Sequence, residues 1–346
     1  MRNKILVLGY FGYGTTQFDG QTIKTRNVYE LLKLKSNDSE DILYFDTYQF
    51  KESVFFLLKM ISSILRCNKL VYIPAHNNLK YLFPLIYTIC KLKRIEILYI
   101  VVGGWLAEYL GNKKLHVFLL SGIRGIFSQS DQLSLKLKDQ YHFKNVITFP
   151  NFRIHSFFYY LKSDHSHFKI VYMARINRMK GIDSVFRLAK YISETPFLTK
   201  PIVIHFYGPI DKSDEDYFFK QVDKSDIITY HGVLPPEIIH ETLAEYDLLV
   251  LPTRFYTEGF PGTILDAYIS SVPVVVTKWK YATEFVDHGK TGLIVPFENG
   301  EKDFIDSVMR LYFNQDLLST MRKNVYERSK QYSSDYAWSI LEKYIS

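Results

Sequence analysis

Short apolar segments of strand length alternate with longer helical patterns along most of the chain. The alternation runs through the first half and starts again at FKIVYMA (168–174). Strands that alternate with helices are typical of a parallel sheet covered by helices on both faces. The pattern therefore predicts an α/β protein with two doubly wound domains. In such sheets ligands bind beyond the carboxyl ends of the strands, so the loops at those ends are candidate sites.

The expected elements follow from this pattern. In the first half, apolar runs predict strands at 4–10, 41–45, 69–73, 95–101 and 125–128, with a helix over 21–35. In the second half, strands are expected at 168–174, 201–208, 227–232, 247–253 and 272–278, and helices at 181–193, 235–246, 262–271, around 301–313 and over 315–346.

Length and segment order predict where the domains divide. A chain of 346 residues suits two domains, and the aromatic-rich segment 155–167 resembles a connection. We expect one domain over 1–153, a second over 168–330, and a last helix over 331–346 that returns to the first domain. The opening MRNKILVLGYFGYG is interpreted as a strand and glycine loop rather than a signal peptide, because its apolar run is short.

Cysteine content and hydropathy limit the function classes. The two cysteines, Cys67 and Cys90, exclude a disulfide scaffold or a cysteine-based zinc site and indicate a reducing, cytoplasmic compartment. The ten histidines show no zinc-like spacing. The apolar run 54–65 is broken by a lysine and is shorter than the ~18 residues that a spanning helix needs, so no bilayer-spanning segment is expected.

Charge is distributed unevenly. Residues 1–165 carry 22 Lys and Arg against 12 Asp and Glu, whereas 166–346 carry 21 against 24. Two apolar segments, 53–69 and 79–94, each end in a cationic cluster, an arrangement that suits a helix at an anionic membrane surface. A solvated surface without a partner is the alternative. Nucleic acid binding is not expected, because no DNA- or RNA-binding motif is present.

The segment LLVLPTRFYTEGFPGTILDAYISSVPVVVT (248–277) carries the most chemical information. An apolar strand leads into a glycine-rich loop with Glu258, and a helix begins at about Thr263. The amides at such a helix start bind phosphate. Asp266 follows inside the helix, so the two carboxylates can hold hydroxyls at two ends of a sugar nucleotide. In the alternative interpretation Glu258 only caps the helix and Asp266 is solvated.

A second segment, FKIVYMARINRMKGID (168–183), places Arg175 and Lys180 in the loop after a strand. Two cations that converge on a diphosphate neutralise its charge, most strongly as the diphosphate departs. Arg178 lies in the same loop and is given no role, which makes it an internal control. The alternative is a pair of exposed loop cations.

Together these motifs resemble the family 4 glycosyltransferases. The family pattern of a Glu, seven residues and a second Glu stands here as Glu258-GFPGTIL-Asp266, and its Arg and Lys stand as Arg175 and Lys180. Further similarity lies in FYG (206–208), YHGVL (230–234) and EFVDHGKTGLIVP (284–296). The resemblance is strong over 147–300 and topological before that. It implies a GT-B fold, two Rossmann-like domains facing across a cleft, and retaining transfer of a sugar from a nucleotide diphosphate to an acceptor hydroxyl.

The resemblance also implies roles for residues. The catalytic group would be Arg175 and Lys180, which hold the diphosphate, and Glu258, which contacts donor-sugar hydroxyls. The donor-binding group would comprise the sugar-positioning amides of Gly259 and Phe260, Gly262 and Thr263 at the phosphate, and Asp266 at the ribose. The family usually has Glu at the last of these positions, so the ribose contact is either direct after a helix shift or made through water. Backbone around Gly208 and 231–234 would contact the base.

The N-terminal half supplies weaker candidates. Gly20, with Gln21, Thr22 and Lys24, would offer amides and a cation to the donor, and a structural turn with a helix cap is the alternative. For the acceptor, the resemblance directs attention to the ends of the later strands. His76, Trp105 and Glu108 are the expected contacts there, although His76 alone can equally be an exposed loop residue.

No metal or other cofactor is expected. Asp214-Glu215-Asp216 imitates a metal-binding Asp-x-Asp pattern, but it precedes a helix, where acids are favoured. We therefore expect a metal-independent enzyme with a nucleotide-diphosphate sugar donor and a glycan acceptor linked to a lipid. It would act in bacterial surface polysaccharide synthesis, on the inner face of the cell membrane. A sugar-nucleotide epimerase and a non-catalytic GT-B partner subunit are the alternatives.

Overall fold

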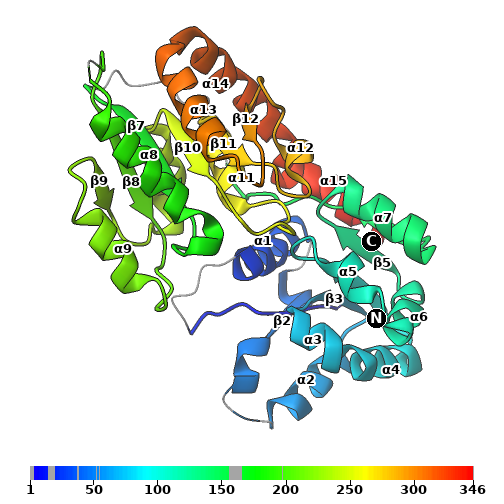
Figure 1. Ribbon diagram of the computed structural model, residues 1–346. Helices are drawn as coiled ribbons and strands as arrows, with labels where there is room; N and C mark the ends of the chain where they lie inside the picture. The colour runs from blue at the N-terminus through cyan, green and yellow to red at the C-terminus, as the bar shows by residue number, and fades with distance from the viewer. Residues whose placement is uncertain are drawn as a thin grey trace. The chain divides into compact units, whose positions relative to one another are not determined.

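The computed structural model describes residues 4–14, 20–36, 39–51, 53, 55–155, 166–196 and 198–345. The chain divides into two compact units (Figure 1). Unit 1 contains residues 1–155 and 332–346, and unit 2 contains residues 156–331. Each unit has its own parallel six-stranded sheet, so each can be described by itself.

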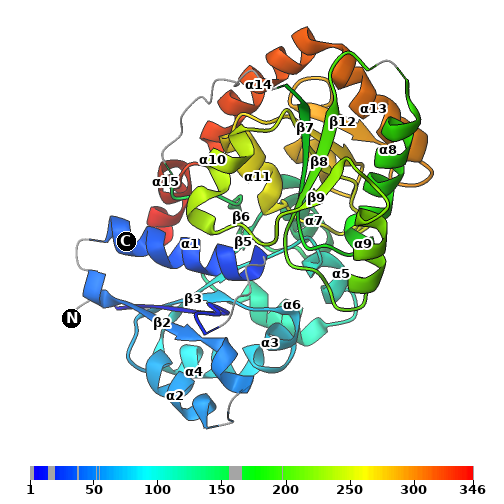
Figure 2. The same cartoon turned by 90° about the vertical axis from the view of Figure 1, so that its left-hand side faces the viewer.

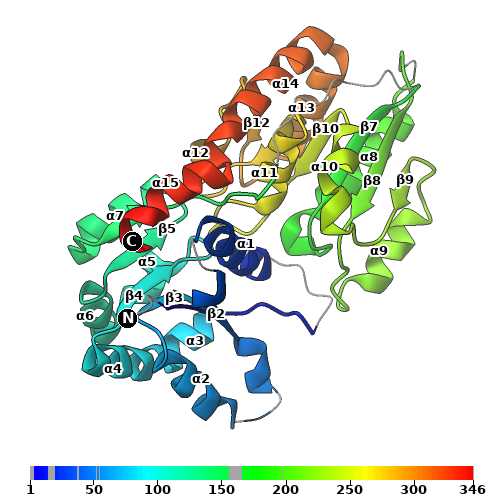
Figure 3. The same cartoon turned by 180° about the vertical axis from the view of Figure 1, so that it is seen from behind.

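The sheet of unit 1 has the strand order β2-β1-β3-β4-β5-β6, and all its strand pairs are parallel. The strands are β1 (Ile5–Gly9), β2 (Ile42–Asp46), β3 (Lys69–Ile73), β4 (Glu96–Ile100), β5 (Gly125–Ser128) and β6 (Val146–Thr148). The helices are α1 (Gly20–Lys35), α2 (Phe56–Ile64), α3 (His76–Tyr81), α4 (Phe83–Lys93), α5 (Leu106–Leu110), α6 (Lys114–Ser121), α7 (Asp131–Tyr141) and α15 (Ser334–Ile345). Helix α1 lies on one side of the sheet, and α2, α3 and α4 lie on the other (Figures 2 and 3).

Helix α15 follows unit 2 in sequence but packs in the core of unit 1. Leu341 and Ile345 are buried in a cluster that also contains residues of α1 and of the sheet. The Lys69 ammonium donates a 2.7 Å hydrogen bond to the carbonyl of Ile345, and Lys35 forms a 2.8 Å ion pair with Asp335. The last segment is therefore an integral part of unit 1.

The sheet of unit 2 has the order β12-β11-β10-β7-β8-β9, again parallel throughout. Its strands are β7 (Phe168–Met173), β8 (Ile202–Tyr207), β9 (Ile228–Tyr230), β10 (Leu248–Leu251), β11 (Val274–Thr277) and β12 (Gly292–Val295). The helices are α8 (Ile182–Glu194), α9 (Glu215–Val222), α10 (Ile239–Ala244), α11 (Gly262–Ile269), α12 (Ala282–Phe285), α13 (Glu301–Phe313) and α14 (Gln315–Ser329).

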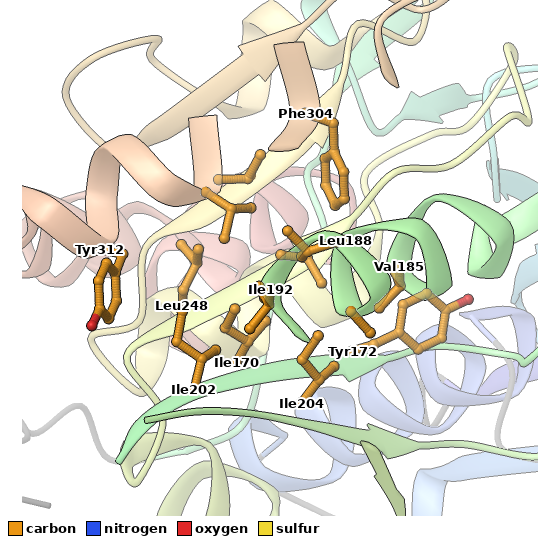
Figure 4. Close-up of a cluster of buried hydrophobic side chains, with 14 of the residues drawn as sticks. Ile170, Tyr172, Val185, Leu188, Ile192, Ile202, Ile204, Leu248, Phe304 and Tyr312 are labelled. Carbon is orange, nitrogen blue, oxygen red and sulfur yellow. The ribbon is translucent and has the colours of Figure 1, made fainter. Parts of the chain in front are cut away.

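A continuous apolar core fixes the strand ends of unit 2 (Figure 4). Ile170, Ile204 and Leu248 from three neighbouring strands are fully buried, and Leu188 of α8 and Phe304 of α13 pack against them. Full burial of such a side chain contributes about 1.5–3 kcal/mol. This packing gives the loops after β7 and β10 a rigid base.

The observed elements confirm the predicted strand–helix alternation in both halves. Strands β6 and β12 were not among the expected strands, and the predicted closing helix 315–346 is two helices. The break falls where the chain passes from unit 2 to unit 1. There the Ser333 side chain accepts a hydrogen bond from the Tyr336 amide and starts α15. Within the described residues, no helix is both long and apolar enough to cross a bilayer.

Candidate functional site

The loop after β7 carries Arg175 and Lys180 and is tightly constrained. The Asn177 carboxamide oxygen accepts the Lys180 amide hydrogen at 2.8 Å, and the Asn177 Nδ2 donates to Asp211 at 2.5 Å. The guanidinium of Arg175 is exposed and lies 3.8 Å from the same Asp211. The loop therefore has a defined conformation that presents its cations at the carboxyl edge of the sheet.

Gly181 lets this loop approach the end of β10. Its φ is +84°, and a Cβ at this position would lie 1.8 Å from the carbonyl oxygen of Pro252. Only glycine fits both the left-handed backbone and this contact. The Arg254 amide also donates to the carbonyl of Met179 at 2.8 Å. The loop of Lys180 and the loop of Glu258, whose two residues are 78 positions apart in the sequence, are thereby held side by side.

Lys180 and Glu258 meet directly, as an ion pair with a hydrogen bond between the Lys180 ammonium and the Glu258 carboxylate. Their side chains retain 24% and 15% of their exposure, so water still reaches the pair. Arg178 turns away from it. Its guanidinium stacks over Tyr217 at 4.1 Å and approaches Asp214 at 3.5 Å. The loop thus places Lys180, the predicted binding cation, beside Glu258 and directs Arg178, the internal control, away from it.

The start of α11 lies immediately after Glu258 and Gly259. The N-cap residue is Pro261, and no side chain caps this helix. The alternative in which Glu258 caps α11 is therefore wrong. The Thr263 hydroxyl oxygen is buried without a hydrogen-bond partner in the described part of the chain. A buried hydroxyl at the positive end of a helix is a suitable contact for an anionic oxygen.

Phe260 and Gly259, which precede α11, are both buried. The Phe260 ring stacks on Phe285 with a centroid distance of 4.2 Å and nearly parallel planes. Side-chain packing therefore holds the backbone of this loop. The resemblance implies that these two residues position the donor sugar through their backbone amides. The observed packing is compatible with that role, which stays a prediction.

Asp266 is buried rather than solvated, so the solvated alternative is wrong. Its carboxylate oxygen lies 3.2 Å from the Nε2 of His240 on α10, and both side chains are at most 10% exposed. No sequence pattern predicts this pair, since the residues are 26 positions apart. The predicted ribose contact of Asp266 stays a prediction, now with His240 beside it.

A polar aromatic cluster that the sequence did not predict lies along β8. The His205 Nδ1 is 2.8 Å from the Tyr246 hydroxyl, which is 2.9 Å from the Tyr207 hydroxyl. His231 stacks on the Tyr207 ring. Burial, with the neighbouring His231 and a lysine, lowers the pKa of His205 to about 4. Burial also lowers the pKa of His231.

Gly208, at the end of β8, allows another close backbone approach. Its φ is +134°, and a Cβ would lie 2.0 Å from the carbonyl of Ala174. Its amide donates to the carbonyl of Gly232 at 2.8 Å. The expected base-contacting segments, Gly208 and 231–234, are therefore neighbours. A base contact itself stays a prediction.

In unit 1, Gly20 is the first residue of α1 and has no atom within 4 Å of a Cβ placed on it. The loop residues before it, 15–19, lie outside the described residues. Lys24 is buried and donates a 2.7 Å hydrogen bond to the carbonyl of Pro150, under the ring of Phe149. The expectation that Lys24 presents a cation at the helix start is therefore wrong, because α1 turns this side chain into the core.

The three acceptor candidates follow β3 and β4: His76 is the first residue of α3, Trp105 precedes α5, and Glu108 lies in α5. The rings of His76 and Trp105 contact each other and share a third neighbour, Tyr109, which the sequence analysis had not singled out. Glu108 is exposed and forms a 3.0 Å ion pair with Lys136 of α7. The structure thus brings two of the candidates together, and Glu108 is paired with α7.

The acidic residues Asp214, Glu215 and Asp216 lie at the start of α9. Asp214 precedes α9, and its carboxylate accepts the Arg178 amide hydrogen at 3.1 Å. In the ranges that the structure describes, no group of three or more His, Cys, Asp and Glu side chains is arranged to hold a metal ion.

The two parallel six-stranded α/β sheets are those of the GT-B glycosyltransferase architecture. Residues 159–328, just under half of the chain, match the model of the family described as glycosyl transferases, group 1. This stretch includes all the unit 2 candidates named above.

Similar proteins agree with this placement. The chain is 29% identical over 186 residues to the capsular polysaccharide biosynthesis glycosyltransferase CapM of Staphylococcus aureus, covering 53% of this chain and 47% of CapM. It is 22% identical over 173 residues to the alpha-galactosylglucosyldiacylglycerol synthase of Streptococcus pneumoniae, covering 50% and 44%. The matched part thus spans about half the length of these relatives.

Solved structures show the same fold over the whole chain. Anabaena HepE, solved with UDP-glucose, superposes with a TM-score of 0.75 at 15% identity over 98% of both chains. Sucrose-phosphate synthase from Thermosynechococcus elongatus gives 0.75 at 14% identity, covering 99% of this chain and 98% of the synthase. At these identities the similarity establishes the fold alone.

Proposed function

We propose that the chain is a retaining glycosyltransferase that moves a sugar from a nucleotide-diphosphate sugar to an acceptor hydroxyl. The observation that carries the proposal is the meeting of Lys180 and Glu258 beside the start of α11. This combination offers a cation, a hydroxyl and a helix start to a diphosphate, and a carboxylate to a sugar. The match of residues 159–328 to the glycosyltransferase family model supports it.

The proposed chemistry is electrostatic. Arg175 and Lys180 bind the diphosphate, and the buried hydroxyl of Thr263 with the Gly262 end of α11 receives a phosphate oxygen. As the bond between the sugar and the diphosphate breaks, negative charge grows on the leaving oxygen. Cations already fixed in place then stabilise the transition state more than the bound donor. No metal ion enters this scheme.

The Lys180–Glu258 pair implies an order of events. In this pair the two side chains neutralise each other. A diphosphate competes with Glu258 for the ammonium, and a carboxylate released in this way accepts hydrogen bonds from the donor-sugar hydroxyls. Arrival of the diphosphate would thus prepare the sugar contact. Gly259 and Phe260 position the same sugar through their amides, and Asp266 with His240 serves the ribose.

For the acceptor we propose a lipid-linked glycan at the inner face of the cell membrane, in bacterial surface polysaccharide synthesis. CapM supports the polysaccharide setting by its name. In unit 1, Leu92 of α4 and Phe118 of α6 are exposed by 78% and 67%. The exposed cations Lys91 and Lys114 are next to or close to them in sequence. Apolar side chains beside cations suit an anionic bilayer.

A nucleotide-binding screen tests the donor assignment. The purified chain is examined by thermal shift and calorimetry with UDP, GDP, ADP, CMP and TDP in the presence of EDTA. One nucleoside diphosphate should raise the melting temperature, and Lys180→Ala should abolish the effect. If none of them binds, the proposal fails in favour of a non-catalytic subunit. Epimerised donor formed without any acceptor would instead indicate an epimerase.

A further inference from the structure

We propose that His76, Trp105 and Tyr109 of unit 1 form a platform that binds one pyranose ring of the acceptor. This inference rests on the proposed function only in taking the acceptor to be a glycan. The three residues are called the ring platform below. His76 is the first residue of α3, which follows β3. Trp105 and Tyr109 belong to the segment after β4, where Trp105 precedes α5 and Tyr109 lies within it.

The ring platform is a mutual contact of three side chains. The His76 ring lies 4.9 Å from Trp105 and 4.8 Å from Tyr109, and the two aromatic rings are 5.6 Å apart at nearly right angles. His76 is exposed, whereas Trp105 and Tyr109 are half-buried. The platform therefore has a fixed inner side and an outer side that water reaches.

Backbone geometry fixes the central ring. The Trp105 indole N–H donates to the carbonyl of Val102 at 2.8 Å. Gly103 has a φ of +82°, and a Cβ there would lie 3.0 Å from the Trp105 Cδ1. The glycine thus leaves room for the indole in this orientation. A side chain fixed in advance loses little conformational entropy when a ligand binds.

Two polar groups of the platform, the His76 imidazole and the Tyr109 hydroxyl, are not used by the fold. The His76 imidazole makes ring contacts but no hydrogen bond with the residues that the structure covers. The Tyr109 hydroxyl is buried without a partner among those residues, and burial raises its pKa. A buried polar atom without a partner is unfavourable, so a ligand that supplies one gains affinity.

A pyranose matches this combination of groups. The C–H face of a sugar ring packs on an aromatic face, and its hydroxyls both donate and accept hydrogen bonds, as His76 and Tyr109 require. The ionic side chains next to the platform, Glu108 and Lys136, are engaged with each other at 3.0 Å. A neutral, hydroxyl-rich ring therefore fits better than an anion.

Indole NMR signals provide the test. The chain has three tryptophans, Trp105, Trp279 and Trp338, so its ¹⁵N spectrum contains three indole signals, and Trp105→Phe assigns the platform signal. The probes are the methyl α-glycosides of glucose, galactose and mannose, with N-acetylglucosamine. At least one should shift the Trp105 signal and leave that of the buried Trp279 unchanged. Sorbitol, which has hydroxyls but no ring, and inorganic phosphate should not.

Variants complete the test. Trp105→Ala and His76→Ala should each weaken binding of the active glycoside at least about tenfold, as expected for loss of a stacking or hydrogen-bonding partner. Trp338→Phe, in α15, is the matched control and should not. Nucleotide binding should persist in all three variants. The platform is overturned if no glycoside shifts the Trp105 signal or if sorbitol shifts it equally. Failure of the wild-type protein to bind any nucleotide would instead overturn the proposed function.

Discussion

The two units use the same sheet plan but equip its carboxyl edge differently. In unit 2, the loops after β7 and β10 carry charge, with Lys180 and Glu258 paired across them. In unit 1, the segments after β3 and β4 carry rings, with His76 and Trp105 in contact. The paired charges suit the diphosphate proposed for unit 2, and the rings suit the sugar ring proposed for unit 1. The same sheet plan thus presents two different surfaces at its carboxyl edge.

The charged edge of unit 2 should show the largest effect. Lys180→Ala and Glu258→Ala should each reduce turnover at least about 100-fold, since removal of one transition-state donor typically costs a factor of about 10²–10³. Arg178→Ala should change turnover little, because this side chain contacts Tyr217 and Asp214 rather than Glu258. Steady-state kinetics with sugar conjugates of the nucleoside diphosphate that the screen selects measures all three. Equal losses at Arg178 and Lys180 would show that the loop does not separate their roles.

The second test concerns the outer helices of unit 1. A Leu92→Ser, Phe118→Ser double variant should bind anionic phosphatidylglycerol vesicles at least about tenfold more weakly, because burial of one such side chain contributes about 1.5–3 kcal/mol. Leu34→Ser is the matched control, since Leu34 is 63% exposed but lies on α1, on the opposite side of the sheet. Vesicle co-sedimentation at low and high salt measures both. Vesicle binding that depends on neither lipid charge nor salt concentration would contradict the membrane assignment.

A smaller effect, on nucleotide affinity, is expected when the negative charge that pairs with Lys180 is removed. Glu258→Gln should bind the nucleoside diphosphate about fivefold more tightly, since couplings between contacting residues are about 0.5–3 kcal/mol, while turnover falls. In the Lys180→Ala background, where nucleotide binding is expected to be lost, the same change should not restore it. Calorimetry on the wild type, the two single variants and the double variant separates two explanations. One is direct competition between Glu258 and the diphosphate for Lys180, and the other is a general effect of removing a negative charge. A gain of equal size in both backgrounds would rule out exchange of the ammonium between carboxylate and diphosphate.

The smallest effect is a pH dependence of unit 2. His205 is neutral in the folded protein because its pKa is lowered to about 4, whereas an unfolded histidine titrates near 6.5. Between these values the unfolded chain binds more protons, so stability falls as the pH drops from about 6.5 toward 4. Melting temperatures at pH 7 and 5 should differ by about 2 °C less in His205→Asn than in the wild type. An unchanged difference would assign the acid sensitivity to other groups.

Residue pattern alone predicted the α/β fold and its two sheets, because buried parallel strands are continuous apolar runs. It also predicted the loops of Arg175, Lys180 and Glu258, where glycines and charges occur at close spacing. It could not predict contacts between distant positions, such as Asp266 with His240. Nor did the pattern show that Lys24, expected to offer a cation to the donor, is buried and bonded to a backbone carbonyl, because a lysine carries no apolar signal for burial.

The path of the chain through unit 1 has a consequence for biosynthesis. Unit 1 requires α15, whose Leu341 and Ile345 lie in its core, and Arg153 receives the returning chain through a 3.2 Å hydrogen bond from its amide to the carbonyl of Tyr332. During translation, residues 156–331 leave the ribosome before this helix. Domains generally fold as units as they emerge. Unit 1 can therefore complete its core only after all of unit 2 has been synthesised, and a chain truncated before residue 334 would keep every element of unit 2 but lack the last helix of unit 1.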